Sequence, residues 1–396
     1  MSHGVSNPAS AVPSAAANVA ASDDVRAPVL QVAQLETHFS SRAGLVKAVN
    51  QVSFAVGRGK IMGLVGESGS GKSMTGYSIM GLIDPPGRVV GGSIRLNGTE
   101  LRGLGGEAMR ALRGNRIAMI FQDPMMTLNP VLRIDTQMIE AIQAHENVSR
   151  AAALERCRAA LAQVGIPSPD QRLKSYPHQF SGGMRQRVAI ATALLLKPDV
   201  IIADEPTTAL DVTIQGQILA EMQTLCRESG TALIWITHDL SVIAGLADEV
   251  CVMYAGRIVE RGTVDDVLDR TAHPYTQGLL DSVPSSGLHR PRGTRLRQIP
   301  GMTPSLTNLA PGCPFRTRCA FASVQCAQDP LLEPVSAMHR QDPLQQPLSR
   351  PSLLDQPVLS SLPSGPFSSP PLRTSPAAHE VSCFHPLTAR VSACPP

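Results

Sequence analysis

The residues best suited to chemistry begin with glycines around one lysine, in the run Gly66-Glu67-Ser68-Gly69-Ser70-Gly71-Lys72-Ser73. This run has the GxxxxGK[ST] pattern of a phosphate-binding loop. Its glycines let the backbone approach an anionic phosphate tail closely and turn N–H groups toward it. Lys72 adds a mobile positive charge for the β- and γ-phosphates, and the Ser73 hydroxyl is suited to Mg²⁺. We therefore expect residues 66–73 to bind a nucleoside triphosphate.

A second group of chemical interest is the acidic pair Asp204-Glu205, which follows the apolar run 200–203. The carboxyl end of a buried strand is the usual place for ligand chemistry in α/β sheets. Asp204 would hold Mg²⁺ through water, and Glu205 would orient and polarise the water that attacks the γ-phosphate. Alone, such a pair is more often a solvated feature of the surface. Beside a phosphate loop, the catalytic interpretation is favoured.

Apolar runs and breakers predict the elements that position these residues. Strands are expected at 52–56, 61–65, 117–121 (ending at Gln122), 199–203 and 232–236. Helices are expected at 72–82, stopped by Asp84-Pro85-Pro86-Gly87, then over about 135–175, most clearly at 151–164, and near 215–228. The order strand, glycine loop, helix at 61–82 is the context that a phosphate loop requires. The alternation predicts an α/β core with a helical insertion.

Composition places the chain among ordinary globular proteins. It has 396 residues, of which 43% are apolar and 17% charged, and a net charge of +3. That charge, with only 3% aromatic residues, does not indicate a nucleic-acid partner. No apolar run approaches the roughly 18 residues that would span a bilayer. The eight cysteines do not suggest a disulfide scaffold in a chain of this length.

Ser181-Gly182-Gly183 and His238 complete an order of motifs that resembles the nucleotide-binding subunit of ABC transporters, over about residues 30–284. The resemblance implies a P-loop NTPase core with an antiparallel β subdomain and a helical insertion. It also implies that Ser181, Gly182 and Gly183 open a helix whose N-terminus faces the γ-phosphate of ATP bound by the opposite subunit. Exposed N–H groups and the helix dipole suit such a contact. Met184 stands where many relatives carry Gln.

The same resemblance assigns roles to four single residues. Gln122 would sense Mg²⁺ and lie where the ATPase touches the membrane subunit. Asp211 would belong to the segment that crosses the dimer interface, and His238 would contact the γ-phosphate and steady Glu205. Phe39 falls where an aromatic ring stacks on adenine, and core packing is an equally good interpretation of this residue.

The sequence segments between the motifs resemble those of the oligopeptide/dipeptide importer branch, and they extend the resemblance to about residue 326. The matching segments are 176–180, 204–213, 253–257, 273–276, 299–302 and 312–315. The resemblance to this branch implies that the chain is an ATPase at the cytoplasmic face of the inner membrane. It also implies that nucleic acid is not among its partners. Its partners would be a homologous but different ATPase chain, two transmembrane permease subunits and an extracytoplasmic substrate-binding protein. Nickel or another small solute is the alternative cargo.

Four cysteines near the C-terminus suggest a further cofactor. Members of this branch can carry a four-iron four-sulfur cluster there, which would use Cys313, Cys319 and Cys326, with Cys383 as the fourth ligand. Zn²⁺ would also suit four thiolates. The competing interpretation is a set of free structural thiols without metal.

These observations divide the chain into five parts. Residues 1–28 are expected to be a disordered leader, 29–284 the ATP-binding domain (with the helical subdomain at about 123–185), and 285–326 an importer-type extension. A Pro/Ser-rich insert at 327–380 and a tail at 381–396 would follow. Two other classes stay open: a non-transport ABC ATPase, and a P-loop kinase or GTPase in which 181–183 and His238 match by accident.

Overall fold

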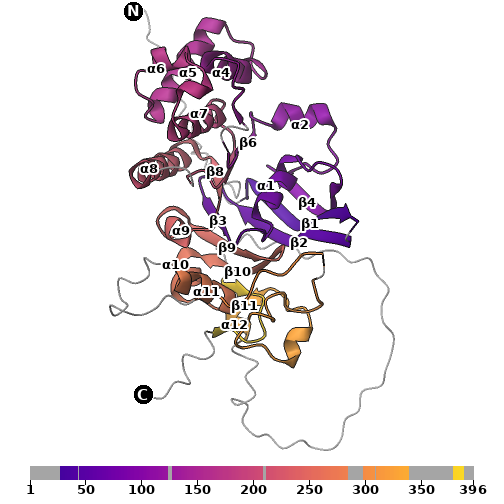
Figure 1. Ribbon diagram of the computed structural model, residues 1–396. Coiled ribbons are helices and arrows are strands. Elements are labelled where there is room, and N and C mark those ends of the chain that lie inside the picture. The colour runs from indigo at the N-terminus through magenta and orange to yellow at the C-terminus, as the bar shows by residue number, and fades with distance from the viewer. Residues whose placement is uncertain are drawn as a thin grey trace, which may run out of the picture.

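The computed structural model describes residues 27–42, 44–123, 127–207, 211–283, 298–307, 309–338 and 378–387. In Figure 1 the helices α4 to α7 lie at one end of the molecule, the two sheets in the middle, and the C-terminal segments at the opposite end. Nearly all of the predicted leader and most of the predicted 327–380 insert lie outside the described residues. Residues 327–338 of that insert range are described and include β11 and α12. No helix in the described ranges is long and apolar enough to cross a membrane.

The larger sheet has eight strands in the order β11-β12-β10-β9-β3-β8-β7-β6. β6, β7, β8, β3 and β9 run parallel, while β10, β12 and β11 each join by antiparallel pairing. The strand bounds are β3 Ile61–Val65, β6 Ile117–Ile120, β7 Val200–Asp204, β8 Ala232–Thr237, β9 Glu249–Tyr254, β10 Arg257–Thr263, β11 Glu333–Pro334 and β12 Glu380–Val381. The carboxyl ends of β3, β8, β7 and β6 therefore meet at one edge.

The central strands are apolar throughout because both faces of the sheet are covered. In β8, Leu233 and Trp235 belong to one buried cluster, while Ala232, Ile234 and Ile236 belong to another on the opposite face. β3 alternates in the same way between the two clusters. A parallel sheet covered on both faces gives such near-continuous hydrophobic runs. The predicted strands at 61–65, 199–203 and 232–236 are thus confirmed within one residue.

The smaller sheet is antiparallel, with the order β2-β1-β4-β5. Its strands are β1 Leu30–Ser41, β2 Gly44–Val56, β4 Gly87–Leu96 and β5 Thr99–Glu100. In Figure 1 this sheet lies beside the parallel strands, and α1 stands between them. The expected P-loop core with an antiparallel β subdomain is confirmed.

The helices bear out the expected insertion between β6 and β7. Their bounds are α1 Lys72–Met80, α2 Gly106–Leu112, α4 Ile134–Gln143, α5 Arg150–Gln163, α6 Pro169–Leu173, α7 Gly182–Leu194, α8 Val212–Ser229, α9 Leu240–Leu246, α10 Val264–Asp269, α11 Pro274–Ser282 and α12 Val335–Met338. α1 ends two residues earlier than predicted. Gly81 adopts a left-handed conformation (φ 63°) and closes the helix, so the later prolines are not its stop signal.

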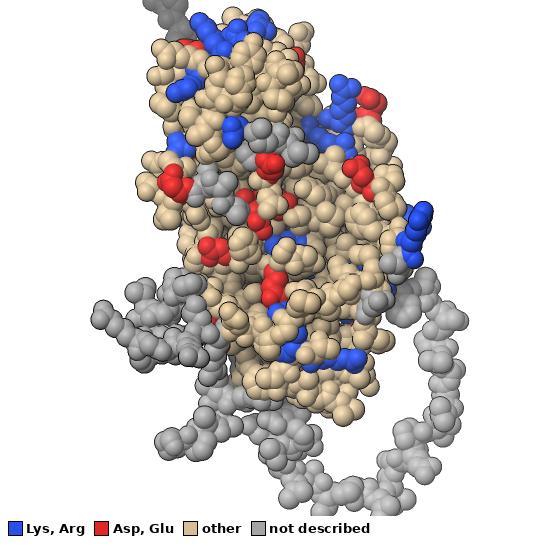
Figure 2. All heavy atoms as spheres, in the orientation of Figure 1, with Lys and Arg blue, Asp and Glu red and all other residues tan. Residues whose placement is uncertain are grey.

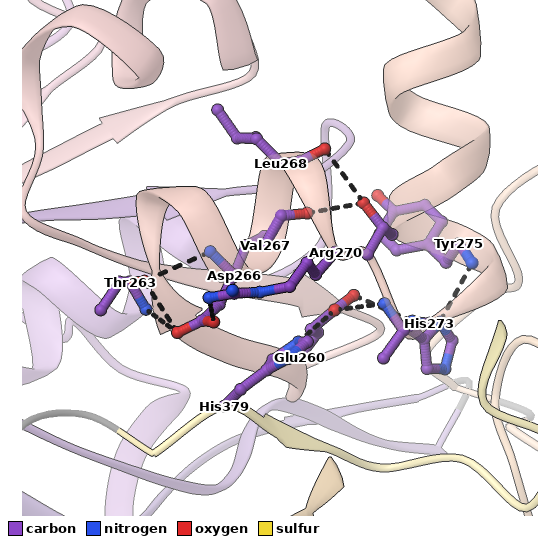
Figure 3. Close-up of polar contacts among 11 residues, drawn as sticks. Glu260, Thr263, Asp266, Val267, Leu268, Arg270, His273, Tyr275 and His379 are labelled. Atoms are coloured by element: carbon purple, nitrogen blue, oxygen red, sulfur yellow. Dashed lines mark hydrogen bonds and ion pairs between the residues drawn. The ribbon is translucent and has the colours of Figure 1, made fainter. Parts of the chain in front are cut away.

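A buried carboxylate anchors the C-terminal segment to the core (Figure 3). Glu260, fully buried in β10, accepts hydrogen bonds from the backbone N–H groups of Ala272 (2.7 Å) and His273 (3.0 Å). His379 Nε2 lies 2.9 Å from the same carboxylate. Arg261, on the same strand, pairs with Glu380 at 2.5 Å. These contacts hold β12 against β10, between that strand and the edge strand β11.

We predict that Glu260→Ala lowers the free energy of unfolding by about 3 kcal/mol, because it leaves two buried N–H groups without an acceptor. Denaturant unfolding followed by circular dichroism measures the change. Glu228→Ala, which removes an exposed carboxylate from α8, is the matched control and should change stability little. A loss below about 1 kcal/mol would mean that Glu260 does not anchor this region.

Candidate nucleotide site

The phosphate loop connects β3 to α1, and its shape requires glycine at two positions. Gly66 has φ 153°, and a Cβ there would lie 2.2 Å from the carbonyl oxygen of Met253. Gly71 has φ 103°, and its Cβ would lie 2.3 Å from the carbonyl oxygen of Ala48. Any side chain would push the loop away from the strands behind it. The predicted strand, loop and helix context is therefore present.

Lys72 is folded back over the loop. Its Nζ donates hydrogen bonds to the carbonyl oxygens of Gly66 (2.8 Å) and Glu67 (3.0 Å). Burial lowers the pKa of Lys72, while the charges of Glu205 and Asp204 act in the opposite direction. A desolvated ammonium held by neutral carbonyls can exchange them for anionic phosphate oxygens at a gain in electrostatic energy.

Asp204 and Ser73 form the part of the site that fits Mg²⁺. Ser73 Oγ donates to Asp204 Oδ1 at 2.9 Å. Asp204 is fully buried at the end of β7, and its Oδ2 has no hydrogen-bond partner among the described residues. Burial raises the pKa of this carboxyl, and the charge of Glu205 raises it further, against the hydrogen bond from Ser73 and the charge of Lys72. A buried carboxylate oxygen without a partner beside a hydroxyl is a suitable donor set for a hard divalent cation.

Both carboxylate oxygens of Glu205 meet predicted site residues. Gln122 Nε2 donates to Oε2 at 3.2 Å, and His238 Nδ1 lies 3.1 Å from Oε1. The backbone of Glu205 has φ 45° and its N–H donates to the carbonyl of Ile236 at 2.9 Å. The ends of β6, β7 and β8 thus bring the three expected catalytic residues together. A carboxylate held at both oxygens can accept a proton from a water molecule that hydrogen-bonds to it. The catalytic roles stay predictions.

Ser181 and Asp211 each cap a helix. Ser181 Oγ accepts from Met184 N–H (3.3 Å) at the start of α7, and a Cβ on Gly182 would meet nothing within 4 Å. Asp211 accepts from Ile214 N–H (3.0 Å) at the start of α8, and residues 208–210 before it lie outside the described residues. Among the described residues neither side chain hydrogen-bonds to the phosphate loop. Their expected contacts with an opposite subunit stay predictions.

Phe39 lies in β1, half-buried, and pairs with Val46 and Gly87 on the neighbouring strands. Its ring covers Gly87 so closely that a Cβ there would lie 2.4 Å from a ring carbon. The ring therefore packs on the antiparallel sheet. Its stacking on adenine stays a prediction.

The four C-terminal cysteines gather in one region. Burial raises the pKa of Cys383 to about 12, and the charges of Cys313, Cys319 and Cys326 add to the shift. Within the described ranges, however, no three His, Cys, Asp or Glu side chains are placed to hold a metal ion. The structure therefore describes four neighbouring cysteines and, within the described ranges, not an assembled metal site.

Sequence reasoning missed one group of contacts on the phosphate loop. Arg318, Thr303 and Tyr275 all hydrogen-bond to Glu67. Tyr275 lies in a segment that indicated the family branch, but no motif or spacing signalled that it reaches the loop.

Figure 2 shows acidic side chains over the middle of one face, with Lys and Arg scattered among and around them.

Two family models and several known proteins match this chain, and all of them are described as belonging to ABC or peptide transporters. A family model described as "ABC transporter" matches residues 49–208, and one described as "Oligopeptide/dipeptide transporter, C-terminal region" matches 259–326. The oligopeptide transport ATP-binding protein OppD of Escherichia coli is 48% identical over 305 residues, which cover 77% of this chain and 89% of OppD. The dipeptide transport ATP-binding protein DppD of Bacillus subtilis is 49% identical over 299 residues, with 75% and 88% covered.

Solved structures share the fold. A dimeric ATP-binding cassette, MJ0796, bound to ADP and Pi, has a TM-score of 0.55 at 24% identity, covering 59% of this chain and 98% of its own. The ATP-binding subunit of an ABC transporter has a TM-score of 0.51 at 30% identity, covering 61% and 92%.

We predict that Asp204→Asn raises the thermal unfolding midpoint of the nucleotide-free protein by a few degrees Celsius at neutral pH, because it removes a buried charge. Since the folded-state pKa of Asp204 is raised, its ionised form destabilises the fold above that pKa. The gain should therefore shrink as the pH falls toward about 3.9, the ordinary Asp value.

Differential scanning calorimetry across pH measures this effect. The matched control is Asp84→Asn, which changes an exposed carboxylate. An unchanged or lower midpoint for Asp204→Asn at neutral pH would contradict the destabilising role of this buried charge.

Proposed function

The chain belongs to the ATP-binding subunits of ABC transporters, and from this premise we propose that it hydrolyses ATP to drive the import of di- or oligopeptides. The observation that carries the catalytic part is the environment of Glu205: Gln122 and His238 contact its carboxylate, and it directly follows Asp204, which accepts a hydrogen bond from Ser73. Water attacks the γ-phosphate and the products are ADP and phosphate.

In the proposed mechanism the chain's own groups divide the work. Lys72 leaves the loop carbonyls to neutralise phosphate charge, and the glycine loop donates its N–H groups. Ser73 and Asp204 would hold Mg²⁺, which supplies further neutralisation of the phosphates. Glu205 orients the attacking water and takes its proton. His238 and Gln122 keep the Glu205 carboxylate turned toward that water.

The proposed partners follow because this chain supplies one phosphate loop and one Ser181-Gly182-Gly183 segment. Each nucleotide site would combine the phosphate loop of one subunit with that segment of the other. We infer that Ser181 and Gly183 bind the γ-phosphate held by a second ATPase subunit, with Asp211 at the interface. The helix end at Ser181 supports this, because Gly182 leaves it open for an anion. That second subunit would be a homologous, different chain. Two transmembrane permease subunits and an extracytoplasmic binding protein would complete the importer, with this chain at the cytoplasmic face of the inner membrane.

Peptides are proposed as cargo on two grounds. Relatives that cover most of this chain's length are named for oligopeptide and dipeptide transport. The match at 259–326 is to a C-terminal region described for the same class of transporter. Uptake of labelled peptides by cells with and without this chain tests the proposal, and uptake of nickel tests the alternative cargo. Unchanged peptide uptake with lost nickel uptake would reverse the assignment.

We also propose that Cys313, Cys319, Cys326 and Cys383 hold a four-iron four-sulfur cluster once iron and sulfide are supplied. Two features support it: the thiols are neighbours, and backbone N–H groups of Phe321 and His385 point at the sulfurs of Cys319 (3.4 Å) and Cys383 (3.3 Å). N–H···S bonds are a usual feature of such clusters. Cluster binding would require the four sulfur atoms to move closer together, since the present arrangement of the described residues is not a metal site.

Iron and acid-labile sulfide analysis of anaerobically purified protein tests this proposal. We expect about four of each per chain, lost in Cys383→Ser. Colourless protein that stays free of iron after reconstitution would leave the interpretation of four free thiols.

We predict that Glu205→Gln retains ATP binding but loses hydrolysis by a factor of about 100 or more, because the general base is removed. Lys72→Ala should instead weaken ATP binding, because the phosphates lose their mobile cation. Phosphate release by the assembled transporter and binding of a fluorescent ATP analogue measure the two effects.

Glu228→Gln is the control for Glu205→Gln, since it makes the same change on an exposed helix face. Turnover close to that of the unmodified chain in Glu205→Gln would refute the proposed role. The same variant should associate with its partner ATPase only when ATP is present.

A further inference from the structure

The C-terminal extension reaches back onto the phosphate loop at Glu67. Arg318 pairs with both oxygens of this carboxylate, with Nη1 2.6 Å from Oε2 and Nη2 3.0 Å from Oε1. Thr303 Oγ1 donates to Oε2 at 3.1 Å. The backbone N–H of Glu67 donates to the hydroxyl of Tyr275 at 2.8 Å. The second residue of the phosphate loop is thus held by three residues far along the chain.

Arg318 is itself fixed by contacts outside the loop. Its side chain is only 5% exposed, and Nε donates to the carbonyl of Pro300 at 2.9 Å. The guanidinium lies 5.8 Å from the ring centroid of Tyr254 and 5.9 Å from that of Phe315. Tight turns tie its backbone into the segment that also carries Cys319. A buried, bidentate and stacked arginine has little conformational freedom left to lose.

The charge of Glu67 makes this contact relevant to nucleotide binding. Burial alone would raise the pKa of Glu67, but the hydrogen bonds and charge of Arg318, with Thr303 and Lys72, hold it below its usual range. The carboxylate is therefore ionised at neutral pH, on the loop that receives a polyanionic phosphate tail. An unpaired negative charge there would repel the phosphates. The ion pair removes that repulsion.

We propose that Arg318 is a positioning residue for ATP: by neutralising and fixing Glu67, it lets the C-terminal extension set the affinity of the phosphate loop. This inference rests on the proposed function, because it requires residues 66–73 to bind ATP. Its consequence is that the extension is a working part of the nucleotide site. A change in the fold of residues 298–326 would be felt at the phosphates through one ion pair.

A charge-compensation cycle tests the proposal on the full-length chain, with equilibrium binding of Mg·ATP as the readout. Arg318→Gln should raise the Kd for ATP roughly tenfold, the size expected for one uncompensated charge close to another. Glu67→Gln together with Arg318→Gln removes both charges of the pair, so the Kd of this double variant should return to within about twofold of that of the unmodified chain. Arg318→Lys keeps the charge and should fall between Arg318 and Arg318→Gln.

Arg316→Gln is the matched control. It removes the same charge two positions away, and among the described residues its guanidinium makes no contact with the phosphate loop, so its Kd should not change. If the double variant binds ATP as weakly as Arg318→Gln alone, the effect of Arg318→Gln is one of folding and the proposal is wrong. An unchanged Kd in Arg318→Gln would also overturn it. Should Arg318→Gln not fold, Glu67→Gln alone gives the complementary comparison: it leaves the Arg318 charge uncompensated beside the phosphates and should lower the Kd, and an unchanged or higher Kd would overturn the proposal.

The same binding measurements distinguish a failure of the proposed function from a failure of the coupling. If the unmodified chain binds no Mg·ATP, the proposed function is wrong. If the unmodified chain binds Mg·ATP and the Arg318 variants bind it equally well, only the coupling through Glu67 is wrong.

Discussion

The nucleotide site depends on one costly arrangement, the full burial of the Asp204 carboxylate at the end of β7. One of its oxygens is satisfied by Ser73 and the other has no partner among the described residues. A buried, half-satisfied carboxylate is unfavourable in the free protein and is kept where a cation will complete it. Its position fixes the neighbouring Glu205, and the adjacent ends of β6 and β8 supply Gln122 and His238 to the carboxylate of Glu205.

The C-terminal part of the chain is continuous with the ATPase core. β12 pairs with β10, Glu260 receives hydrogen bonds from Ala272 and His273, and His379 meets the same carboxylate. On the side of the nucleotide, Arg318 pairs with Glu67. β12 of the C-terminal tail therefore joins one side of the larger sheet, while Arg318 of the 285–326 extension contacts the phosphate loop.

The features that could be predicted from the sequence are those that depend on residues close together in the chain. The phosphate loop follows from glycine geometry, and the strands at 61–65 and 232–236 follow from burial on both faces of the sheet. The gathering of Gln122, Glu205 and His238 could be expected from strand ends and family order. Contacts between distant segments could not be predicted. Arg318 and Glu67 are 251 positions apart, and the sequence around each residue gives no sign that the two form an ion pair. The pairing of β12 was missed because two residues carry no periodicity.

The most direct test of this nucleotide site is an experimental structure of the Glu205→Gln chain with Mg·ATP. We expect Ser73 Oγ to lie about 2.1 Å from Mg²⁺. Lys72 Nζ should have left the carbonyls of Gly66 and Glu67 for phosphate oxygens, with the pair between Arg318 and Glu67 intact. Nucleotide bound elsewhere, or Lys72 still on the loop carbonyls beside bound ATP, would contradict the proposed site.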